Sequence, residues 1–390
     1  MRIASVAGAA GRRHPAEARG RTVMSLRREL EDPAGPLGRY LADRFPDRAH
    51  TLARWGQALA GRPVLQPPGP THQDRVGRAF AYRLGYAFRL DPPYAAIAGA
   101  GGPDAERLLA LTVGRFPSHA GDTLGSARAL AGHRHLVPPA GGSPAAGSPG
   151  SNGGGGGEDL VASLAEFFGW FASLPAHLTV HNAPLPPQLE RDLCRACYVF
   201  AVLEEGPPAA VDAWPGLAPA ALAARLRVGD LDGLVPAADL ADLEALAGAL
   251  TGMLAAPAWR RLVEQGPELV TVAPLFVDGW AAADLVVGPT LVDVDLTAAP
   301  APAPALLDRL LVCALLDRGG WYGIARVGVW DGRRAMLVDA DLAELLTEAS
   351  GEHLDLDTVG AELAEVAFAG RPELRARWAT GQPGGPTATG

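Results

Sequence analysis

The sequence of 390 residues contains no lysine, so all 34 of its basic side chains are arginines. Any mechanism that needs a lysine ammonium group is therefore excluded. The 43 acidic residues give a formal net charge of −9, which argues against a broad basic surface for nucleic acid. A local groove lined by arginines remains compatible with this composition.

Cysteine and long apolar runs are also scarce. Cys194 and Cys197 form a lone CxxC in an apolar, helix-like run, and a zinc site would need a second pair of ligands. We therefore predict buried thiols in a reducing cytoplasm. His133 and His135 adjoin a low-complexity stretch, which disfavours a metal role. No segment is apolar enough to span a membrane, and the N-terminus lacks the apolar core of a signal peptide.

Changes in composition divide the chain into segments. Residues 1–23 are rich in arginine, alanine and glycine without periodicity, which predicts a disordered tail, and Met24 is a candidate start. The alternative is a basic arm that binds nucleic acid. The remaining predicted segments are a helical region at 24–255 with a disordered Gly/Ser/Pro insertion at 140–157, an α/β core at 256–350, and a C-terminal helix and disordered tail at 351–390.

One helix of the N-terminal region has an apolar face and several arginines. Apolar side chains recur at helical spacing, at Val76, Phe80, Leu84 and Phe88. The accompanying basic residues are Arg75, Arg78, Arg83 and Arg89. We predict a core helix with a solvated arginine face. The alternative is an edge that contacts phosphate groups.

The segment 281–297, AAADLVVGPTLVDVDLT, predicts a β-hairpin around Gly288-Pro289. Pairing Val287 with Thr290 places Asp284 opposite Asp293. Strand alternation then puts Asp295 on the same face as Asp293. Like charges that face each other in a ladder repel, and a hard divalent cation would relieve that repulsion. The spacing therefore predicts that the three carboxylates converge on a metal ion. The alternative is a hairpin whose acidic face lies in solvent.

The elements around this hairpin predict an α+β fold with a small mixed sheet. Their predicted order is a helix at 258–265, a strand at 268–277, the hairpin at 282–297, a helix at 306–316, strands at 322–330 and 335–339, and a helix that begins at 341. The order of the core is thus αβββαββ.

This order, with Asp284 in AADLVVG and Asp293 in TLVDVDL, resembles the PD-(D/E)xK nuclease-like superfamily. The segment from Met24 onward also resembles uncharacterised actinobacterial proteins that join a helical N-terminal region to such a core. The resemblance implies an αβββαβ core in which Asp284, Asp293 and Asp295 hold Mg²⁺ or Mn²⁺ and activate water for phosphodiester cleavage.

Two positions depart from the pattern of that superfamily. Asp295 occupies the position of the motif lysine, and Arg309 lies where related nucleases often carry glutamine. Asp295 could act as a ligand or general base, or mark a site that has decayed. Glu264 or Glu268 could supply the further acid that some members carry.

Arginines near the hairpin are candidates for contacts with DNA phosphates. Arg309 and Arg326 are the principal candidates, followed by Arg333 and Arg334. The alternative is that each serves surface solubility.

Three functions remain open from the sequence. The first is a metal-dependent nuclease-like protein that acts on DNA, with activity weak or lost. The second is a catalytically degenerate nuclease fold that serves as a nucleic-acid-binding or protein-interaction module. The third is an unrelated α+β protein in which the acidic hairpin is a coincidence.

Overall fold

A computed structural model describes most of the chain between residues 25 and 380. The described ranges are 25–101, 104–116, 155–174, 185–206, 212–253, 257–264, 270–277, 280–317 and 322–380. The predicted tail at 1–23, His133, His135, Glu268 and residues 381–390 lie outside them. Residues 140–154 of the predicted insertion also lie outside, whereas residues 155–157 begin a helix.

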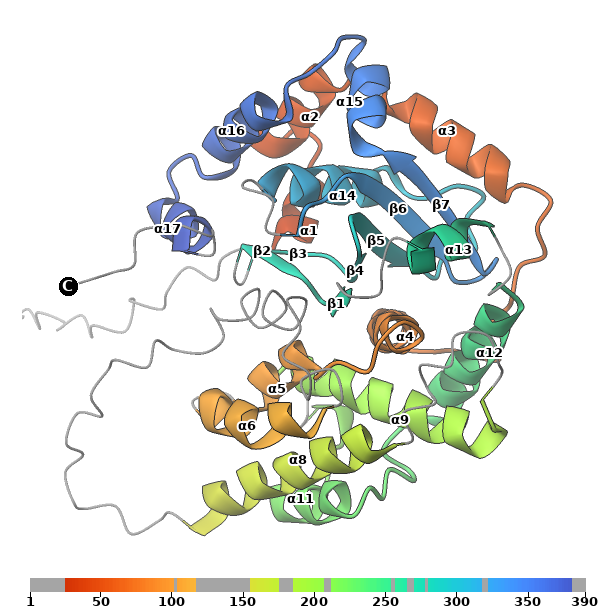
Figure 1. The fold of residues 1–390 in the computed structure, drawn as a ribbon, viewed down its shortest axis with the longest axis vertical. Helices are drawn as coiled ribbons and strands as arrows, with labels where there is room; N and C mark the ends of the chain where they lie inside the picture. Colours follow the sequence, from red (N-terminus) through yellow and green to blue (C-terminus); the bar gives the residue numbers. More distant parts are fainter. Residues whose placement is uncertain are drawn as a thin grey trace, which may run out of the picture.

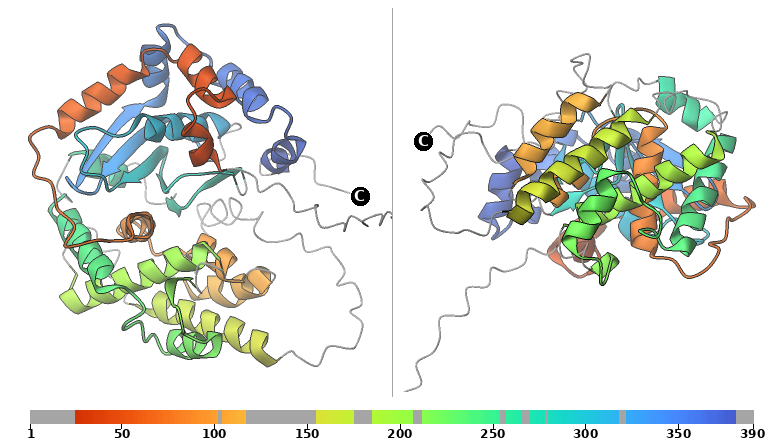
Figure 2. Two further views of the ribbon diagram at one scale, coloured as in Figure 1. Left: turned by 180° about the vertical axis from the view of Figure 1, so that it is seen from behind. Right: turned by 90° about the horizontal axis from the view of Figure 1, so that it is seen from below.

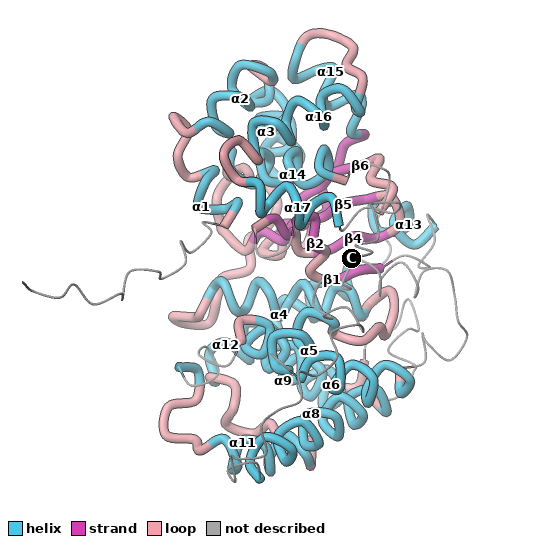
Figure 3. Tube along the Cα trace, turned by 90° about the vertical axis from the view of Figure 1, so that its left-hand side faces the viewer, coloured by secondary structure: helices cyan, strands magenta, loops and turns pink. Residues whose placement is uncertain are grey.

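A five-stranded mixed sheet lies at the centre of the structure, between two layers of helices (Figure 1, Figure 3). In spatial order its strands are β1 (Val270–Val272), β4 (Leu285–Val287), β5 (Thr290–Asp295), β6 (Arg326–Asp331) and β7 (Met336–Asp341). Only β5 and β6 run parallel, and the other neighbours are antiparallel. The protein is therefore a mixed helix-and-sheet protein, as predicted.

The hairpin of β4 and β5 has the predicted register. Val287 pairs with Thr290 and Leu285 with Val292. Gly288 has a φ of 53°, a left-handed conformation that glycine adopts without a steric penalty and that suits the first position of a two-residue hairpin turn. The alternation of the strand is therefore fixed, and Asp293 faces the same side of the sheet as Leu291.

Helix α14 (Pro304–Leu316) connects the parallel strands β5 and β6, which need a crossover rather than a tight turn. Pro304 opens the helix, at a position where its missing N–H costs no helical hydrogen bond. The buried face of α14 packs against the sheet, where Leu310 shares a core with Val286 and Leu291. This packing places Arg309 beside the strand that carries Asp293.

The prediction of a single strand at 268–277 is wrong, because the structure has two short strands in this segment. Strand β1 ends at Val272, and β2 (Leu275–Val277) pairs with β3 (Ala281–Ala282) in a separate two-stranded sheet. Between them Ala273 has a φ of 52°, which is unusual for a residue with a side chain. Pro274 has no N–H to donate to a ladder. The break turns the chain out of the central sheet.

The helices at the two ends of the described chain cover the same face of the sheet as α14 (Figure 1). They are α1 (Leu26–Leu30), α2 (Pro36–Arg44), α3 (Arg48–Leu59), α15 (Leu342–Ser350), α16 (Leu356–Ala367) and α17 (Pro372–Thr380). Leu41, Trp55, Leu310 and Leu345 are among the buried members of this core. The first three helices of the predicted N-terminal helical region thus belong to the layer that contains the C-terminal helices.

A second group of helices covers the opposite face (Figure 2). They are α4 (Gln73–Tyr86), α5 (Tyr94–Gly101), α6 (Ala105–Thr112), α8 (Gly155–Ser173), α9 (Pro187–Glu204), α11 (Pro219–Arg227) and α12 (Ala237–Met253). A short 3₁₀ helix, η2 (Val113–Arg115), follows α6. Phe171 and Phe200 form part of an aromatic core in this layer, which meets the sheet through Leu285 and Val287.

Helix α13 (Pro257–Glu264) lies beside β7 and connects this helical layer to the sheet (Figure 1). Its Trp259 is buried between Phe88 and Trp330, with ring centroids 4.4 and 5.7 Å away, respectively. The helix predicted at 258–265 is therefore present, and an aromatic contact fixes its position against the sheet.

The prediction that the arginines of α4 form a solvated face is wrong, because several of them are largely buried in ion pairs with acids. The Arg83 side chain is 8% exposed, and its Nε and Nη2 lie 2.5 and 2.8 Å from the two carboxylate oxygens of Glu190 on α9. Arg75 pairs with Glu205 at 3.3 Å. Burial of an arginine is tolerated when it is paired in this way.

Cys194, Cys197 and Cys313 are free and buried, so the prediction of buried thiols is confirmed. Burial raises the pKa of the Cys194 thiol well above its usual value, which keeps the thiol protonated. Within the described ranges, no helix combines the length and hydropathy that a membrane span requires.

Candidate functional site

Two of the three predicted carboxylates lie side by side at the end of the hairpin. Asp284 directly precedes β4, and its backbone N–H donates to Asp293 Oδ1 over 3.2 Å. Asp284 Oδ2 in turn accepts from the backbone N–H of Val294 over 2.8 Å. Asp284 is 7% exposed and Asp293 is fully buried. The predicted pairing of Asp284 and Asp293 therefore brings two negative charges together inside the protein.

Arg309 of α14 lies against both of these carboxylates. Its Nε donates to Asp293 Oδ2 over 2.7 Å, and its Nη2 donates to Asp284 Oδ2 over 3.3 Å. Burial opposes the charge of the guanidinium, but Asp293 and Asp284 outweigh that cost and raise the pKa of Arg309. One arginine thus bridges two of the three acids that were predicted to bind a metal.

A second arginine reaches Asp284 from the other helical layer. Arg78 Nη1 of α4 lies 3.4 Å from Asp284 Oδ1, and its Nε lies 3.4 Å from Glu204 Oε1 at the end of α9. Glu204 also accepts a hydrogen bond of 3.0 Å from the Tyr82 hydroxyl. Glu204, together with Asp284 and against the cost of burial, raises the pKa of Arg78. The network therefore links α14, the hairpin and two helices of the opposite layer.

Burial strongly affects the ionisation of Asp293 in this network. Burial raises the pKa of its carboxyl group to about 6, although Arg309 lowers that pKa and Asp284 raises it further. The group is thus ionised at neutral pH mainly because Arg309 is present.

Asp295 does not join the pair formed by Asp284 and Asp293. Its Oδ1 accepts from the backbone N–H of Thr297 over 2.8 Å. Its neighbour across the parallel ladder is Asp331, whose carboxylate is bound by Arg334 at 2.6 Å. In the described part of the chain, no group of three or more His, Cys, Asp or Glu side chains is placed to hold a metal ion.

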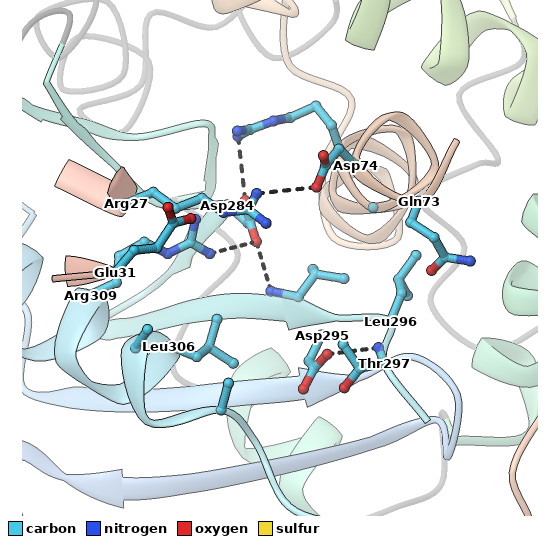
Figure 4. A pocket seen from close by; sticks show the side chains of 15 residues that line it. Arg27, Glu31, Gln73, Asp74, Asp284, Asp295, Leu296, Thr297, Leu306 and Arg309 are labelled. Atoms are coloured by element: carbon cyan, nitrogen blue, oxygen red, sulfur yellow. Dashed lines mark hydrogen bonds and ion pairs between the residues drawn. The ribbon is translucent and has the colours of Figure 1, made fainter. Parts of the chain in front are cut away.

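A pocket of about 330 Å³ lies above this network, between the hairpin, α14, α1 and α4 (Figure 4). Its charged lining consists of Arg27, Glu31, Asp74, Arg78, Asp284, Asp295 and Arg309. Arg27 reaches across from α1 to Asp74 of α4, with Nη1 3.1 Å from Oδ1. The pocket is near the lower end of the range for small-ligand sites, which is roughly 300–1,000 Å³.

The arginines predicted to contact phosphate are engaged within the protein. Arg326 donates twice to Asp339 Oδ2, at 3.0 and 2.7 Å, and is not part of the pocket lining. Arg333 is buried in an ion pair with Asp242. Glu264, a candidate for a further acid, is exposed on α13. Of the four arginines predicted near the hairpin, only Arg309 lies in the pocket.

Glu204, Arg27 and Glu31 were not predicted as site residues, and Arg78 was considered only in the alternative that its helix contacts phosphate groups. Arg78 and Glu204 are 126 positions apart in the sequence, and no local pattern relates an arginine on one helix to an acid at the end of another. The abundance of arginine on α4 was the only signal, because such a helix needs either solvent or acidic partners.

Comparisons with known proteins give no relative from which to transfer a function. No protein-family model matches the sequence. Neither a curated protein nor a solved structure matches the chain.

Proposed function

We propose that residues 257–341 form a nuclease-like core of the PD-(D/E)xK type that binds another protein without cleaving phosphodiester bonds. In the central sheet three strands, β1, β4 and β5, lie between α13 and α14 along the chain, and β6 follows α14. This order, into which the separate β2–β3 pair is inserted, and the paired acids on the central hairpin support the nuclease-like core. The bridge that Arg309 forms between Asp284 and Asp293 carries the proposal that the core is not catalytic, because a guanidinium occupies the side of the acid pair where a metal would bind.

An arginine in this position opposes metal binding in two ways. It satisfies carboxylate oxygens that a cation such as Mg²⁺ would need at roughly 2.0–2.1 Å with near-octahedral geometry. Its positive charge, about 3 Å from those oxygens, also repels a divalent ion in a site of low dielectric. The chain has no lysine to orient the attacking water, so both the metal and the water activation of the superfamily mechanism lack support.

The choice of a protein rather than a nucleic acid as partner rests on charge. The pocket lining has four carboxylates against three arginines, and the whole chain has a net charge of −9. Phosphate groups require a local excess of arginine or lysine. The pocket and the chain as a whole would instead repel a polyanion.

Metal binding is the decisive test of this proposal. Wild type, Arg309→Gln and Asp284→Asn/Asp293→Asn are compared by thermal unfolding in EDTA and in millimolar MnCl₂, with plasmid cleavage as a second readout. We expect wild type to show no Mn²⁺-dependent stabilisation and no cleavage. Arg309→Gln leaves Asp293 without a cation and Asp284 with Arg78 alone, so we expect Mn²⁺ to stabilise it by about 1–3 kcal/mol if the ion reaches 10 to 100 times its Kd.

A Mn²⁺-dependent nuclease is the second candidate, because Asp284 and Asp293 are adjacent on the hairpin as that chemistry requires. It gains support if Mn²⁺ stabilises wild type and the paired asparagine variant abolishes the effect. Cleavage by wild type that disappears in the same variant would refute the non-catalytic proposal. Asp295→Lys in the Arg309→Gln background then tests whether the motif lysine restores cleavage.

A further inference from the structure

The pocket above the acid pair has apolar walls and charged groups at its floor and rim. Val294, Leu296 and Leu306 contribute apolar surface, together with the small side chains of Ala303 and Ala305. Figure 4 shows the charged side chains of Arg27, Glu31 and Asp284 across from Asp295 and Thr297. An amphipathic side chain, apolar along its stem and charged at its tip, suits such a lining.

The arginines of this pocket are already paired. Arg309 binds Asp293 and Asp284, while Arg78 lies between Asp284 and Glu204. The guanidinium of Arg27 pairs with Asp74 at the exposed rim. Acids of the protein therefore neutralise the positive charge of the lining. Two of these acids, Asp293 and Glu204, are not themselves part of the lining.

Two carboxylates of the lining lack a cation. The half-buried Asp295 side chain accepts one hydrogen bond among the described residues, from the Thr297 N–H. Glu31 is exposed, and its side chain has no hydrogen bond or ion pair with another described residue. Asp331, next to Asp295 across the ladder, already has Arg334 as its partner. Negative charge without a counter-ion thus remains in the lining, at Asp295 and across from it at Glu31.

We infer that this pocket binds an arginine or lysine side chain of a partner protein, with Asp295 as the main carboxylate and Glu31 at the rim. The inference rests on the proposed protein-binding function and specifies the chemistry of its partner. The aliphatic stem of the incoming side chain lies against Val294 and Leu306, and its cationic tip supplies the charge that Asp295 lacks. A charge-assisted hydrogen bond of this kind is roughly twice as strong as a neutral one.

The same contacts disfavour the other ligands of this size. A phosphate group would meet Asp295 and Glu31 without an unpaired arginine to bind it. A divalent ion would find only the carboxylates of Asp295 and the exposed Glu31, because Asp284 and Asp293 are held by Arg309, whereas hard cations take six or more oxygen ligands. A cationic side chain needs only one carboxylate and an apolar wall.

The test uses three fluorescent peptides of equal length, with arginine, citrulline or glutamate alternating with glycine. Citrulline has nearly the shape of arginine but no charge. Binding to the full chain is measured by fluorescence anisotropy in EDTA at low and high salt. We expect the arginine peptide to bind at least about tenfold more tightly than the citrulline peptide, with affinity that falls as salt rises.

Variants locate the contact within the pocket. Asp295→Asn should weaken arginine-peptide binding about tenfold, since it removes a charge-assisted hydrogen bond, and Glu31→Gln about two- to threefold at the exposed rim. Glu344→Gln, an exposed acid on α15 outside the pocket, is the matched control and should bind like wild type. Circular dichroism and thermal unfolding establish that each variant is folded, and the exposed Glu31 provides a second test if Asp295→Asn unfolds.

Three results would overturn the inference. They are equal binding of the citrulline peptide, unchanged binding by both pocket variants, and preferential binding of the glutamate peptide or of a single-stranded oligonucleotide. The peptides are titrated in EDTA, so no metal ion affects this measurement. A failure of the arginine peptide to bind can therefore be distinguished from the outcome of the Mn²⁺ and cleavage tests of the proposed function. If the protein neither binds Mn²⁺ nor cleaves DNA, the proposal of a non-catalytic core is supported. If it also does not bind the arginine peptide, the inference of an arginine- or lysine-binding pocket is refuted.

Discussion

Arg333 and Asp242 form a bidentate ion pair although their side chains are 1% and 0% exposed. Nη1 and Nη2 of Arg333 lie 2.5 and 2.8 Å from the two carboxylate oxygens, and Nε donates to the carbonyl of Leu296 over 3.0 Å. Arg333 lies in the turn between β6 and β7, and Asp242 lies on α12. The pair therefore joins the sheet to the helical layer that also supplies Arg78.

Removal of one charge from this pair should be costly. We predict that Asp242→Asn lowers the free energy of unfolding by about 3–5 kcal/mol, because it leaves a buried guanidinium without a counter-ion. Urea denaturation followed by circular dichroism at neutral pH measures this change.

Glu244→Gln on the same helix is the control for Asp242→Asn. Glu244 pairs with Arg191, and both side chains are partly exposed, so its loss should cost less than about 1 kcal/mol. Equal effects of the two substitutions would show that burial does not determine the strength of these pairs.

Gly99 of α5 is expected to tolerate no side chain. A Cβ at this position would lie 2.3 Å from the carbonyl oxygen of Leu203 and 2.7 Å from that of Glu204. Backbone cannot rotate away as a side chain can, so we predict that Gly99→Ala destabilises the protein by about 1–3 kcal/mol. Because Glu204 is the partner of Arg78, the change should also alter the network beneath the pocket.

A glycine on open helix surface provides the comparison for Gly99. Gly248 of α12 has nothing within 4 Å of a built Cβ, so Gly248→Ala should stabilise the protein by about 0.5–1 kcal/mol through helix propensity. Urea denaturation of the two variants decides the prediction. A stabilising Gly99→Ala would contradict the close approach of α5 to the end of α9.

The register of the hairpin could be predicted residue by residue, because it depends on residues that are close together in the sequence. The Gly288-Pro289 turn fixes the register, and strand alternation then fixes the facing of Asp284 and Asp293. The break at Ala273-Pro274 was missed because the flanking residues are as apolar as a continuous strand. The left-handed backbone of Ala273 depends on where β2 pairs, which is a tertiary property.

The partners of the arginines could not be predicted in the same way. A helical pattern gives the side of α4 on which an arginine lies, but not whether solvent or another helix covers that side. Arg83 meets Glu190, and Arg78 meets Glu204, over more than 100 positions. The same limit applies to Arg309. Its position in the sequence suggested a contact with phosphate, whereas the fold directs it to acids on the neighbouring strand.

The pH dependence of stability should reveal the strain at Asp293. Burial raises the pKa of its carboxyl group to about 6 in the folded protein, whereas an aspartate in an unfolded chain titrates near pH 3.9. Between these values the folded protein holds a proton that the unfolded chain has lost. The contribution of Asp293 to stability is therefore greatest below about pH 4 and is lost as the pH rises through 6.

The measurement is the difference in free energy of unfolding between wild type and Asp293→Asn from pH 4 to 7. We predict that the free energy of unfolding of wild type falls by about 2–3 kcal/mol relative to that of Asp293→Asn as the pH rises over this range. The estimate uses roughly 1.4 kcal/mol for each unit by which the pKa is raised. Asp355→Asn should show the opposite sign at lower pH. Hydrogen bonds from Thr358 lower the pKa of Asp355, so its contribution is lost as the pH falls. A flat profile for Asp293→Asn would mean that Arg309 keeps Asp293 ionised throughout this range, with its pKa below 4 despite burial.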